Sequence, residues 1–537
     1  MQTYDYIVVG AGSAGCALAA RLIEAKAGRV LLLEAGPADK NIWIHIPIGY
    51  GKTMFDARLN WQFQSEPQAE LNGRKIYQPR GKTLGGSSSI NGLVYVRGQS
   101  QDFDHWEKLG NPGWGWKDIL PLFQRSERNE RGACEHHGGS GKLGVSNIRG
   151  KHELVEAFIE AGEANGIART QDFNGAVQEG GGYFQLTTRN GLRCSSAKAY
   201  LRPLRGNPDL TVLTDAQAMN IVFEGKRAVG VRYRKDGQVV MARCSQEVIL
   251  SAGAFQSPQL LMLSGVGPAQ ELSAQGIPVV HGLDGVGQNL QDHLQVRLIY
   301  QCTRPITTND HLRTLWGRAS IGLQWLLRKS GPVAAGIQLG GMFARARPDA
   351  DRPDVQFHFG TISADMAAGK PHDFSGFTVS MCQLRPHSRG WVGLKSPDPF
   401  AAPLIQPNYF SHPEDHITML AGVKLTRRLM QSAPMAPYVA QEYRPGPDMK
   451  TDQDMLQFVR EHGTTIFHPV GTCRMGNDAQ SVVDPSLRVR GVRGLRVADA
   501  SIMPTLLSGN TNAGCMVIGE KAADLILQDA RVGQQAA

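Results

Sequence analysis

The sequence predicts an α/β fold, α+β over the whole chain: a Rossmann-like domain with a parallel sheet and a β-meander, and a second domain with an antiparallel sheet flanked by helices. Three observations predict it. A strand, a glycine-rich turn, a helix and a second strand open the chain, strands separated by turn signals fill residues 210–250, and strands alternate with helices from about 297 to 460. At 537 residues the chain is too long for one simple core, so we expect two or three intertwined domains.

The opening unit runs from Asp5 to Glu34 and has the order of a dinucleotide-binding site. Apolar runs at residues 6–9 and 30–33 have the length and β-branched content of buried parallel strands. The glycines between them permit a tight turn, a close approach to a pyrophosphate and helix–strand packing, at Gly10, Gly12 and Gly15 respectively. The helix N-terminus can bind phosphates, and Glu34 can accept hydrogen bonds from a ribose. The unit does not distinguish FAD from NAD.

Residues 81–92, GKTLGGSSSING, form the next glycine-rich loop. Its start resembles the end of a Walker A motif, but position 76 is Ile where that motif needs Gly, so we exclude nucleoside triphosphate binding. Two glycines followed by three serines fit a loop whose backbone approaches a ligand, with the hydroxyls and Asn91 as donors. A flexible linker is the alternative, and the apolar flanks Leu84 and Ile90 argue against it.

Periodicity and turn residues predict the remaining elements in chain order. Helical patterns cover residues 102–126, 152–166, 311–329 and 415–430, and a short helix begins at residue 253. A meander is predicted from strand patterns at residues 211–213, 220–223, 229–233 and 239–243, with Glu-Gly and Asp-Gly turn signals between them. Residues 248–250 return to the parallel sheet, and residues 355–359 and 378–384 form strands of the second domain.

These elements suggest a discontinuous division of the chain. We assign residues 1–150, 206–296 and 462–537 to the dinucleotide-binding domain. Residues 151–205 and 297–461 are assigned to a substrate-binding domain.

Two further patterns are weaker. Cys134, His136 and His137 lie in a glycine-rich loop, but no second ligand cluster accompanies them, so we predict no metal site. Ser195 and Lys198 form an SxxK pair without the companion motifs of a penicillin-binding enzyme. We interpret that pair as a helix start capped by serine.

Composition excludes some classes of function. The net charge is +9, but Lys and Arg are scattered, and the densest set alternates with apolar residues like the exposed face of a strand: Arg488, Arg490, Arg493 and Arg496. We therefore expect no nucleic-acid binding, whereas weak attraction to an anionic membrane or an acidic partner stays open.

Localisation follows from the cysteines and the N-terminus. Eight scattered cysteines without a CxxC pair, no signal peptide and no apolar run of 18 residues predict a cytoplasmic protein with reduced thiols, with peripheral attachment to the inner membrane face left open.

Chemistry-bearing residues concentrate near the C-terminus. His468 precedes Pro469 and is therefore a rigidly held imidazole, either catalytic or structural. Asn510 and Asn512 lie in a tight loop that supplies neutral donors and acceptors, or else simply caps a helix. Neither segment decides between these alternatives alone.

Taken together, five segments resemble the glucose–methanol–choline (GMC) flavoprotein oxidoreductases over essentially the full length. They are the GxGxxG turn with Glu34, GKTLGGSSSIN at 81–91, GAFQSPQLLMLSGVG at 253–267, HPVGTCRMG at 468–476 and GNTNA at 509–513. EHHGGSGKL at 135–143 and LNGRKIYQPRGKTLGG at 71–86 are similar to choline dehydrogenase-like and aliphatic alcohol dehydrogenases.

The resemblance implies FAD as the cofactor. No second GxGxxG loop follows a strand, so one dinucleotide must be the redox group, and electrons leave to a quinone, another carrier or oxygen. The implied cofactor-binding residues are Gly10, Gly12, Ser13, Ala14, Gly15, Glu34, Ala35, Trp61, Gly81, Thr83, Gly85, Gly86, Ser88, Asn91, Gly92, Val94, Ala218, Ser251, Gly253, Asp499, Ala500, Asn510, Thr511 and Asn512.

The implied activity is the oxidation of a primary alcohol to the aldehyde. His468 would act as general base on the hydroxyl, the carbinol carbon would pass a hydride to flavin N5, and Asn510 would bind the developing alkoxide. Asn512 would face the flavin N1–C2 carbonyl, and Asp499 and Ala500 the ribityl–phosphate. The alternatives are an oxidase that releases H2O2, a choline dehydrogenase and a non-redox lyase on the same fold.

Two departures from the family pattern refine these expectations. Some members carry a His that bonds covalently to the flavin where this chain has Ile90, so we predict non-covalent FAD. Phe467 stands where relatives often have Tyr, which makes the pocket less polar. Phe467, Trp61 and Trp325 are the predicted pocket aromatics, and no acidic partner for a quaternary ammonium can be assigned. We expect a monomer or homodimer.

Overall fold

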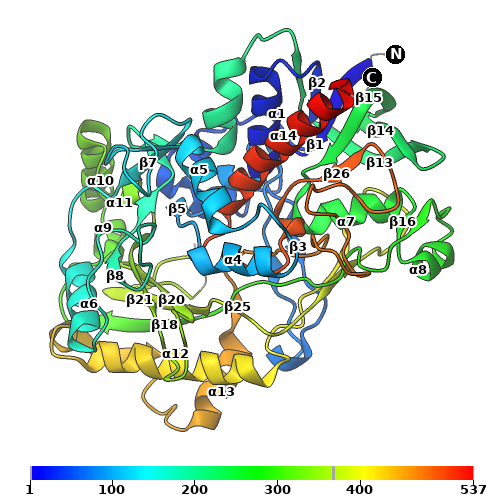
Figure 1. Ribbon diagram of the computed structural model, residues 1–537. Helices are drawn as coiled ribbons and strands as arrows, with labels where there is room; N and C mark the ends of the chain where they lie inside the picture. The colour runs from blue at the N-terminus through cyan, green and yellow to red at the C-terminus, as the bar shows by residue number, and fades with distance from the viewer. Residues whose placement is uncertain (1–2, 366–368, 536–537) are drawn as a thin grey trace.

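The computed structural model describes residues 3–365 and 369–535, and two large sheets dominate it (Figure 1). The first sheet has the strand order β12-β2-β1-β15-β14-β13, with β26 also paired to β15. Its strands are β1 Thr3–Val9, β2 Val30–Leu33, β12 Leu210–Leu213, β13 Ala216–Glu224, β14 Arg227–Lys235, β15 Gln238–Leu250 and β26 Leu495–Val497. The strands β12, β2, β1, β15 and β26 run parallel, and β13, β14 and β15 are antiparallel. The predicted α/β class with a parallel sheet and a meander is confirmed.

Two strand assignments were wrong in detail. Residues 210–213 do not belong to the meander, because β12 pairs in parallel with β2 at the edge of the sheet. The strand predicted at 239–243 and the one predicted at 248–250 are one strand, β15. No Gly, Pro, Asn or Asp separates the two halves, and the chain continues from antiparallel pairing with β14 into parallel pairing with β1.

The glycine turn after β1 has the geometry that the spacing predicted. Gly10 has φ of +102°, and a Cβ there would overlap the carbonyl oxygen of Ser251 on the neighbouring strand end. A Cβ on Gly15 would overlap the Gly10 carbonyl, so the close packing of α1 (Ser13–Glu24) on the turn requires glycine. The last helix, α14 (Asn512–Gln535), packs along α1, which places the C-terminal segment beside the N-terminal turn (Figure 1).

The second sheet is antiparallel, with the order β24-β18-β21-β20-β19-β8 and β25 paired to β18. Its strands are β8 Gly180–Tyr183, β18 Leu294–Cys302, β19 Gln338–Ala344, β20 Val355–Gly360, β21 Gly376–Gln383, β24 Val439–Arg444 and β25 Thr464–Thr465. One face is apolar and is covered by α6 (Glu153–Ala164), α12 (Pro413–Gln431) and α13 (Asp452–His462). The alternate residues form the opposite, more polar face.

The other helices and short strands surround these sheets. The helices are α2 Ile42–His45, α3 Tyr50–Thr53, α4 Ser100–Lys108, α5 Trp116–Ser126, α7 Gly253–Leu263, α8 Ala269–Ala274, α9 Thr308–Arg313, α10 Leu315–Arg328 and α11 Pro332–Ala335. The short strands are β3 Phe63–Gln64, β4 Tyr77–Gln78, β5 Val94–Tyr95, β6 Glu127–Asn129, β7 Leu143–Asn147, β9 Gln185–Leu186, β10 Thr188–Arg189, β11 Leu192–Arg193, β16 Val266–Gly267, β17 His281–Gly282, β22 Trp391–Gly393 and β23 Leu404–Gln406. The helical residues predicted over 102–126 around an Asn-Pro-Gly turn are the two helices α4 and α5.

Several smaller expectations can also be judged. The Ser195 hydroxyl accepts the Lys198 N–H at 3.3 Å, as expected of a helix start. The prediction that the arginines of residues 488–496 line an exposed strand face was wrong: only residues 495–497 form a strand, and Arg496 is buried between Glu247 and Asp529. All eight cysteines lie in the described part of the chain and none forms a disulfide.

The described residues form two principal hydrophobic cores. One joins β1, α1 and β2 to residues 470–526, and the other lies between the second sheet and its helices. The exact domain boundaries given above stay a prediction. Among the helices of the described residues, none combines the length and hydropathy needed to cross a bilayer.

Candidate active site

A cavity of about 340 Å³ runs from the glycine turn of the first sheet to the polar face of the second. Most of the residues predicted to bind the cofactor or the substrate line it. They are Gly10, Gly12, Ser13, Ala14, Glu34, Ala35, Trp61, Gly81, Gly86, Asn91, Gly92, Val94, Ala218, Ser251, Gly253, Phe467, His468, Asp499, Ala500, Asn510, Thr511 and Asn512. The structure therefore brings the two ends of the chain and the 81–92 loop to one site.

Five predicted residues do not line this cavity. Gly15 lets α1 pack closely on the glycine turn, and Gly85 gives the 81–92 loop a φ of +88°. The Thr83 hydroxyl donates to the Pro37 carbonyl at 2.8 Å, and the Ser88 hydroxyl lies 2.9 Å from the Ser196 hydroxyl. These four support the loops around the cavity.

Trp325 is the fifth, and its placement corrects the expected substrate pocket. It lies on α10, outside the cavity, where its indole N–H donates to the Gly191 carbonyl at 3.1 Å.

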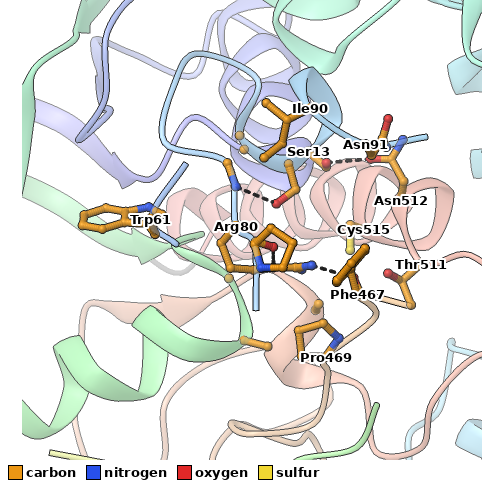
Figure 2. Close-up of a pocket in the computed structure, with 18 of the residues that line it drawn as sticks. Ser13, Trp61, Arg80, Ile90, Asn91, Phe467, Pro469, Thr511, Asn512 and Cys515 are labelled. Carbon is orange, nitrogen blue, oxygen red and sulfur yellow. Dashed lines mark hydrogen bonds between the residues drawn. The ribbon is translucent and has the colours of Figure 1, made fainter. Parts of the chain in front are cut away.

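The glycine-turn end of the cavity fits a dinucleotide. The helices α1 and α14 both begin there, neither has an acidic residue in its first turn, and the Ser13 hydroxyl donates to Asn512 Oδ1 at 2.7 Å (Figure 2). Two positive helix ends therefore meet at one place, as phosphate binding requires. A Cβ on Gly86 would sit 2.7 Å from the Gly12 Cα, so the two loops approach each other as closely as glycine allows.

The two acids that line the cavity both lie at this end and both have backbone partners. Glu34 accepts the Ala11 N–H at 3.1 Å and the Gly36 N–H at 2.9 Å, and burial raises its pKa to about 7. Asp499 accepts the Gly253 N–H at 2.9 Å, which fixes the start of α7, and burial raises its pKa as well. Among the described residues, no other carboxylate lines the cavity.

The two predicted catalytic residues meet in the structure. His468 Nε2 lies 3.2 Å from the Asn510 side-chain nitrogen, and Asn510 Oδ1 accepts from Gln356 at 3.2 Å. The backbone N–H of His468 donates to Asp292 at 2.8 Å, so the imidazole is carried by a fixed loop. Both residues line the cavity, on the side that faces the second sheet.

A second histidine, His293, determines which ring nitrogen of His468 carries the proton. The sequence did not single it out. His293 Nε2 lies 2.9 Å from the Leu384 carbonyl, an acceptor, so this nitrogen must carry a proton. In neutral His293 the other nitrogen is then an acceptor, and it lies 2.9 Å from His468 Nδ1. His468 must therefore donate from Nδ1, which leaves a lone pair on His468 Nε2, the atom beside Asn510.

Burial keeps these imidazoles neutral. The pKa of His468 is well below its ordinary value because the ring is buried and because His293, His358 and Arg80 repel an added proton. Burial also lowers the pKa of His293 to about 4, and that of His358 to about 4. At neutral pH the His468 ring is thus a proton acceptor.

The loop that carries His468 is held in a costly conformation. Phe467 has φ of +72°, which a bulky side chain rarely adopts, and Arg80 donates to its carbonyl at 2.7 Å (Figure 2). Buried Asp292 accepts from Tyr409 and Thr465 at 2.5 Å each. Asp292 and His293 end the segment GVGQNLQDH at residues 285–293, and its glycine-rich, polar pattern is the one signal in the sequence that could have pointed to them.

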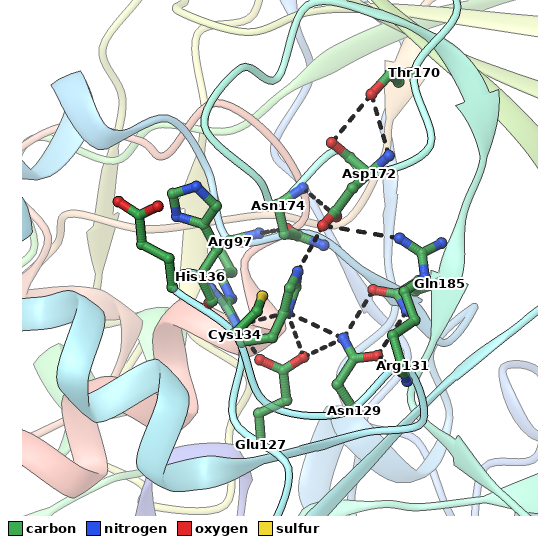
Figure 3. A network of polar contacts seen from close by, with 12 residues as sticks. Arg97, Glu127, Asn129, Arg131, Cys134, His136, Thr170, Asp172, Asn174 and Gln185 are labelled. Atoms are coloured by element: carbon green, nitrogen blue, oxygen red, sulfur yellow. Dashed lines mark hydrogen bonds and ion pairs between the residues drawn. The ribbon is translucent and has the colours of Figure 1, made fainter.

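The weak metal candidate has a different explanation. His137 lies 2.8 Å from Glu127 and 2.6 Å from Asp172 through its two ring nitrogens, inside a polar network with Arg97 (Figure 3). Both nitrogens face carboxylates, which raises the pKa of His137 to about 9 and makes the ring a cation rather than a ligand. Within the described residues, no three His, Cys, Asp or Glu side chains could hold a metal ion.

Comparison with known proteins gives a consistent result. Family models for the GMC oxidoreductases match residues 4–295 and 386–519. An alcohol dehydrogenase (acceptor) of Pseudomonas putida is 46% identical, covering 98% of this chain and 96% of the relative. The mitochondrial choline dehydrogenase of Homo sapiens is 45% identical, covering 97% of this chain and 89% of the relative.

Solved structures agree. Pyridoxine 4-oxidase from Mesorbium loti superposes with a TM-score of 0.87 at 30% identity, covering 97% of this chain and 98% of that one. A formate oxidase superposes with a TM-score of 0.91 at 28% identity, covering 99% of both chains. These matches bear out the resemblance drawn from the five sequence segments.

Proposed function

The chain belongs to the GMC oxidoreductase family, and we propose that, with FAD as its cofactor, it oxidises a primary alcohol to the aldehyde and passes the electrons to a quinone or another non-NAD acceptor. One observation carries the proposal: His468 Nε2 has a lone pair directed beside Asn510 in a cavity that extends to a dinucleotide-type glycine turn.

The chain's own residues supply the proton chemistry. His468 Nε2 accepts the hydroxyl proton of the alcohol, and His293 keeps the Nδ1 proton of His468 in place so that Nε2 is the unprotonated nitrogen. Asn510 donates its side-chain N–H to the alkoxide oxygen as negative charge develops there. Bound FAD would supply the two-electron acceptor for the hydride of the carbinol carbon.

The residues that would hold FAD are those of the glycine-turn end. The starts of α1 and α14 would bind the phosphates, Glu34 the adenosine ribose, and Asn512 the pyrimidine side of the flavin. Ile90 lines the cavity with an aliphatic side chain that cannot form a bond to the ring, so the flavin is held non-covalently. Acid precipitation should release all of it; flavin retained on the denatured chain would contradict this.

The decisive experiment for the activity is anaerobic addition of alcohols to the holoenzyme. Loss of the oxidised flavin absorbance with a primary alcohol is expected, together with the aldehyde as product. A non-redox lyase on the same fold would leave the flavin oxidised with every alcohol. Choline belongs in the panel, because the choline dehydrogenases are nearly as similar to this chain as the alcohol dehydrogenase is.

A membrane quinone is the acceptor that the surface favours. The helix α10 exposes Trp316 by 88%, Leu315 by 81% and Leu327 by 71%, and lies at the periphery of the molecule (Figure 1). It contains Arg318 and Arg328 and no acid. An apolar face with basic neighbours fits an anionic lipid surface.

A second copy of the chain would fit this helix less well, because pairing α10 with itself brings like charges together. Sedimentation with phosphatidylglycerol vesicles, but not with phosphatidylcholine vesicles, is expected. The Trp316→Ser Leu327→Ser double variant should stay in the supernatant.

Oxygen uptake equal to dye reduction would instead favour an oxidase.

A further inference from the structure

The polar face of the second sheet carries a row of side chains that leads away from the catalytic pair. His358 on β20 is paired with Ser380 on β21, and Ser380 is paired with Arg297 on β18. Directly paired residues point to the same face of a sheet, and all three line the cavity. Since neighbouring strands lie about 4.8 Å apart, the Cα atoms of His358 and Arg297 are about 10 Å apart.

Arg297 is a cation whose guanidinium group has an unpaired nitrogen within the described part of the chain. Its Nη1 atom is buried and has no hydrogen-bond partner, and it makes no ion pair within residues 3–365 and 369–535. Asp365, a carboxylate whose charge acts on Arg297, is bound to Arg444 at 2.7 Å and to His372 at 3.3 Å. Burial and Arg444 lower the pKa of Arg297 only to about 10, so the guanidinium is charged at neutral pH.

Leaving such a group unpaired is costly, and the cavity is where its partner can bind. An unpaired buried polar atom costs more than the net gain of a typical hydrogen bond, and a charged one costs more again. Gln338 Oε1 and His358 Nδ1, in the same wall, are also buried without partners. Among the described residues Arg80 is the other cation that lines the cavity, and it is bound to the Phe467 and Pro79 carbonyls.

We propose that the substrate is an alcohol that carries a carboxylate several carbons from its hydroxyl, with the carboxylate bound by Arg297 and the hydroxyl at His468. This rests on the proposed alcohol oxidation and names its substrate class. A planar carboxylate matches the guanidinium fork. A quaternary ammonium such as choline meets a like charge here, and the two carboxylates of the cavity lie at the other end with backbone partners.

The test compares ω-hydroxyalkanoates of three to ten carbons with n-alkanols of equal length and with choline, using the holoenzyme. At the best length the hydroxy acid should have a kcat/KM about 10- to 100-fold above the matched alkanol, the range of a charge-assisted hydrogen-bond pair. In Arg297→Gln this ratio should fall towards one, and Arg297→Lys should restore part of it. Arg304→Gln, which removes an exposed cation just beyond the end of β18 and outside the cavity, should keep the wild-type ratio.

Binding of alkanoates that lack the hydroxyl gives a readout without turnover. Alkanoates of the best length should inhibit competitively and raise the melting temperature of wild-type holoenzyme but not of Arg297→Gln. Equal kcat/KM for acid and alkanol at every length, or alkanoate binding that survives in Arg297→Gln, would overturn the inference. If no alcohol is oxidised, the proposed function fails, and alkanoate binding still decides the role of Arg297.

Discussion

Two buried arginines differ in whether the protein itself supplies hydrogen-bond partners for their side chains. Arg97 is fully buried and bonded to the Glu127 carboxylate and to the His136 carbonyl at 2.5 Å (Figure 3). It also donates to the Tyr95 hydroxyl at 3.2 Å. Arg297 lines the cavity with a buried nitrogen that has no partner.

The difference separates structural from functional polar groups. The side chains of Arg97, Glu127 and His137 find their partners within the protein, so they stabilise the fold and need no ligand. The wall around Arg297 is incomplete, and the catalytic pair His468 and Asn510 lies in the same cavity. Changes in the network should therefore affect stability, and changes in the cavity should affect catalysis or selectivity.

The largest expected effect is on the cavity side. His468→Ala should lower kcat by about 10²- to 10⁴-fold, the usual contribution of a positioned general base, while FAD stays bound. His462→Ala, at a partly exposed position on α13, serves as the control and should leave kcat unchanged. Steady-state turnover and the flavin absorbance of the purified variants are the measurements. A His468→Ala enzyme with wild-type turnover would remove this residue from the mechanism.

On the network side, Glu127→Gln should destabilise the fold without changing the cavity. It leaves Arg97 and His137 buried with one carboxylate charge fewer, which should lower the free energy of unfolding by about 3–5 kcal/mol. Asp56→Asn, which breaks the exposed pair with Arg58, should change stability little. Denaturant unfolding of both variants checks this. A normal stability for Glu127→Gln, or altered substrate selectivity, would break the comparison.

The network also predicts a pH dependence. The pKa of His137 is raised from 6.5 to about 9 by its two carboxylate partners, so its contribution is complete below pH 6.5 and is lost as the pH rises to about 9. After allowance for solvent screening, this corresponds to about 2–3 kcal/mol. Unfolding free energies measured from pH 6 to pH 9.5 should fall for the wild type and fall less for His137→Gln. Parallel curves for the two proteins would contradict the assignment.

The smallest expected effect belongs to Asn510. Asn510→Ala removes one donor to the alkoxide but leaves the base in place, so flavin reduction should slow by about 10- to 100-fold, less than in His468→Ala. Anaerobic stopped-flow reduction measures it. A loss larger than that of His468→Ala would reverse the roles assigned to the two residues.

Local patterns predicted much of the fold. The strand–glycine–helix–strand unit and most of the strands that were predicted lie at the expected residues, because each depends on neighbours in the chain. The strands β8, β18, β19 and β24 of the second sheet were not predicted. The merging of two predicted strands into β15 was missed, since half of that strand pairs with β1, more than two hundred residues away. Arg496 was misplaced for the same reason, because its partners Glu247 and Asp529 are remote in sequence.

The site was predicted in part, and what was missed depends on strand register. His468 and Asn510 lie in short distinctive segments, so the sequence could point to both. The role of His293 depends on its contact with His468, and the role of Arg297 depends on its position opposite β21. A single sequence does not contain these pairings. The charge of the cavity wall therefore became visible only in three dimensions.

The most direct test of the whole account is the pH dependence of anaerobic flavin reduction by a primary alcohol. Because the pKa of His468 lies well below 6.5 and its neutral form is the base, the rate should rise with pH, level off below pH 6.5 and stay constant above it, and His468→Ala should lose the rise. A rate that still climbs steeply above pH 7, or the same profile in His468→Ala, would contradict the account.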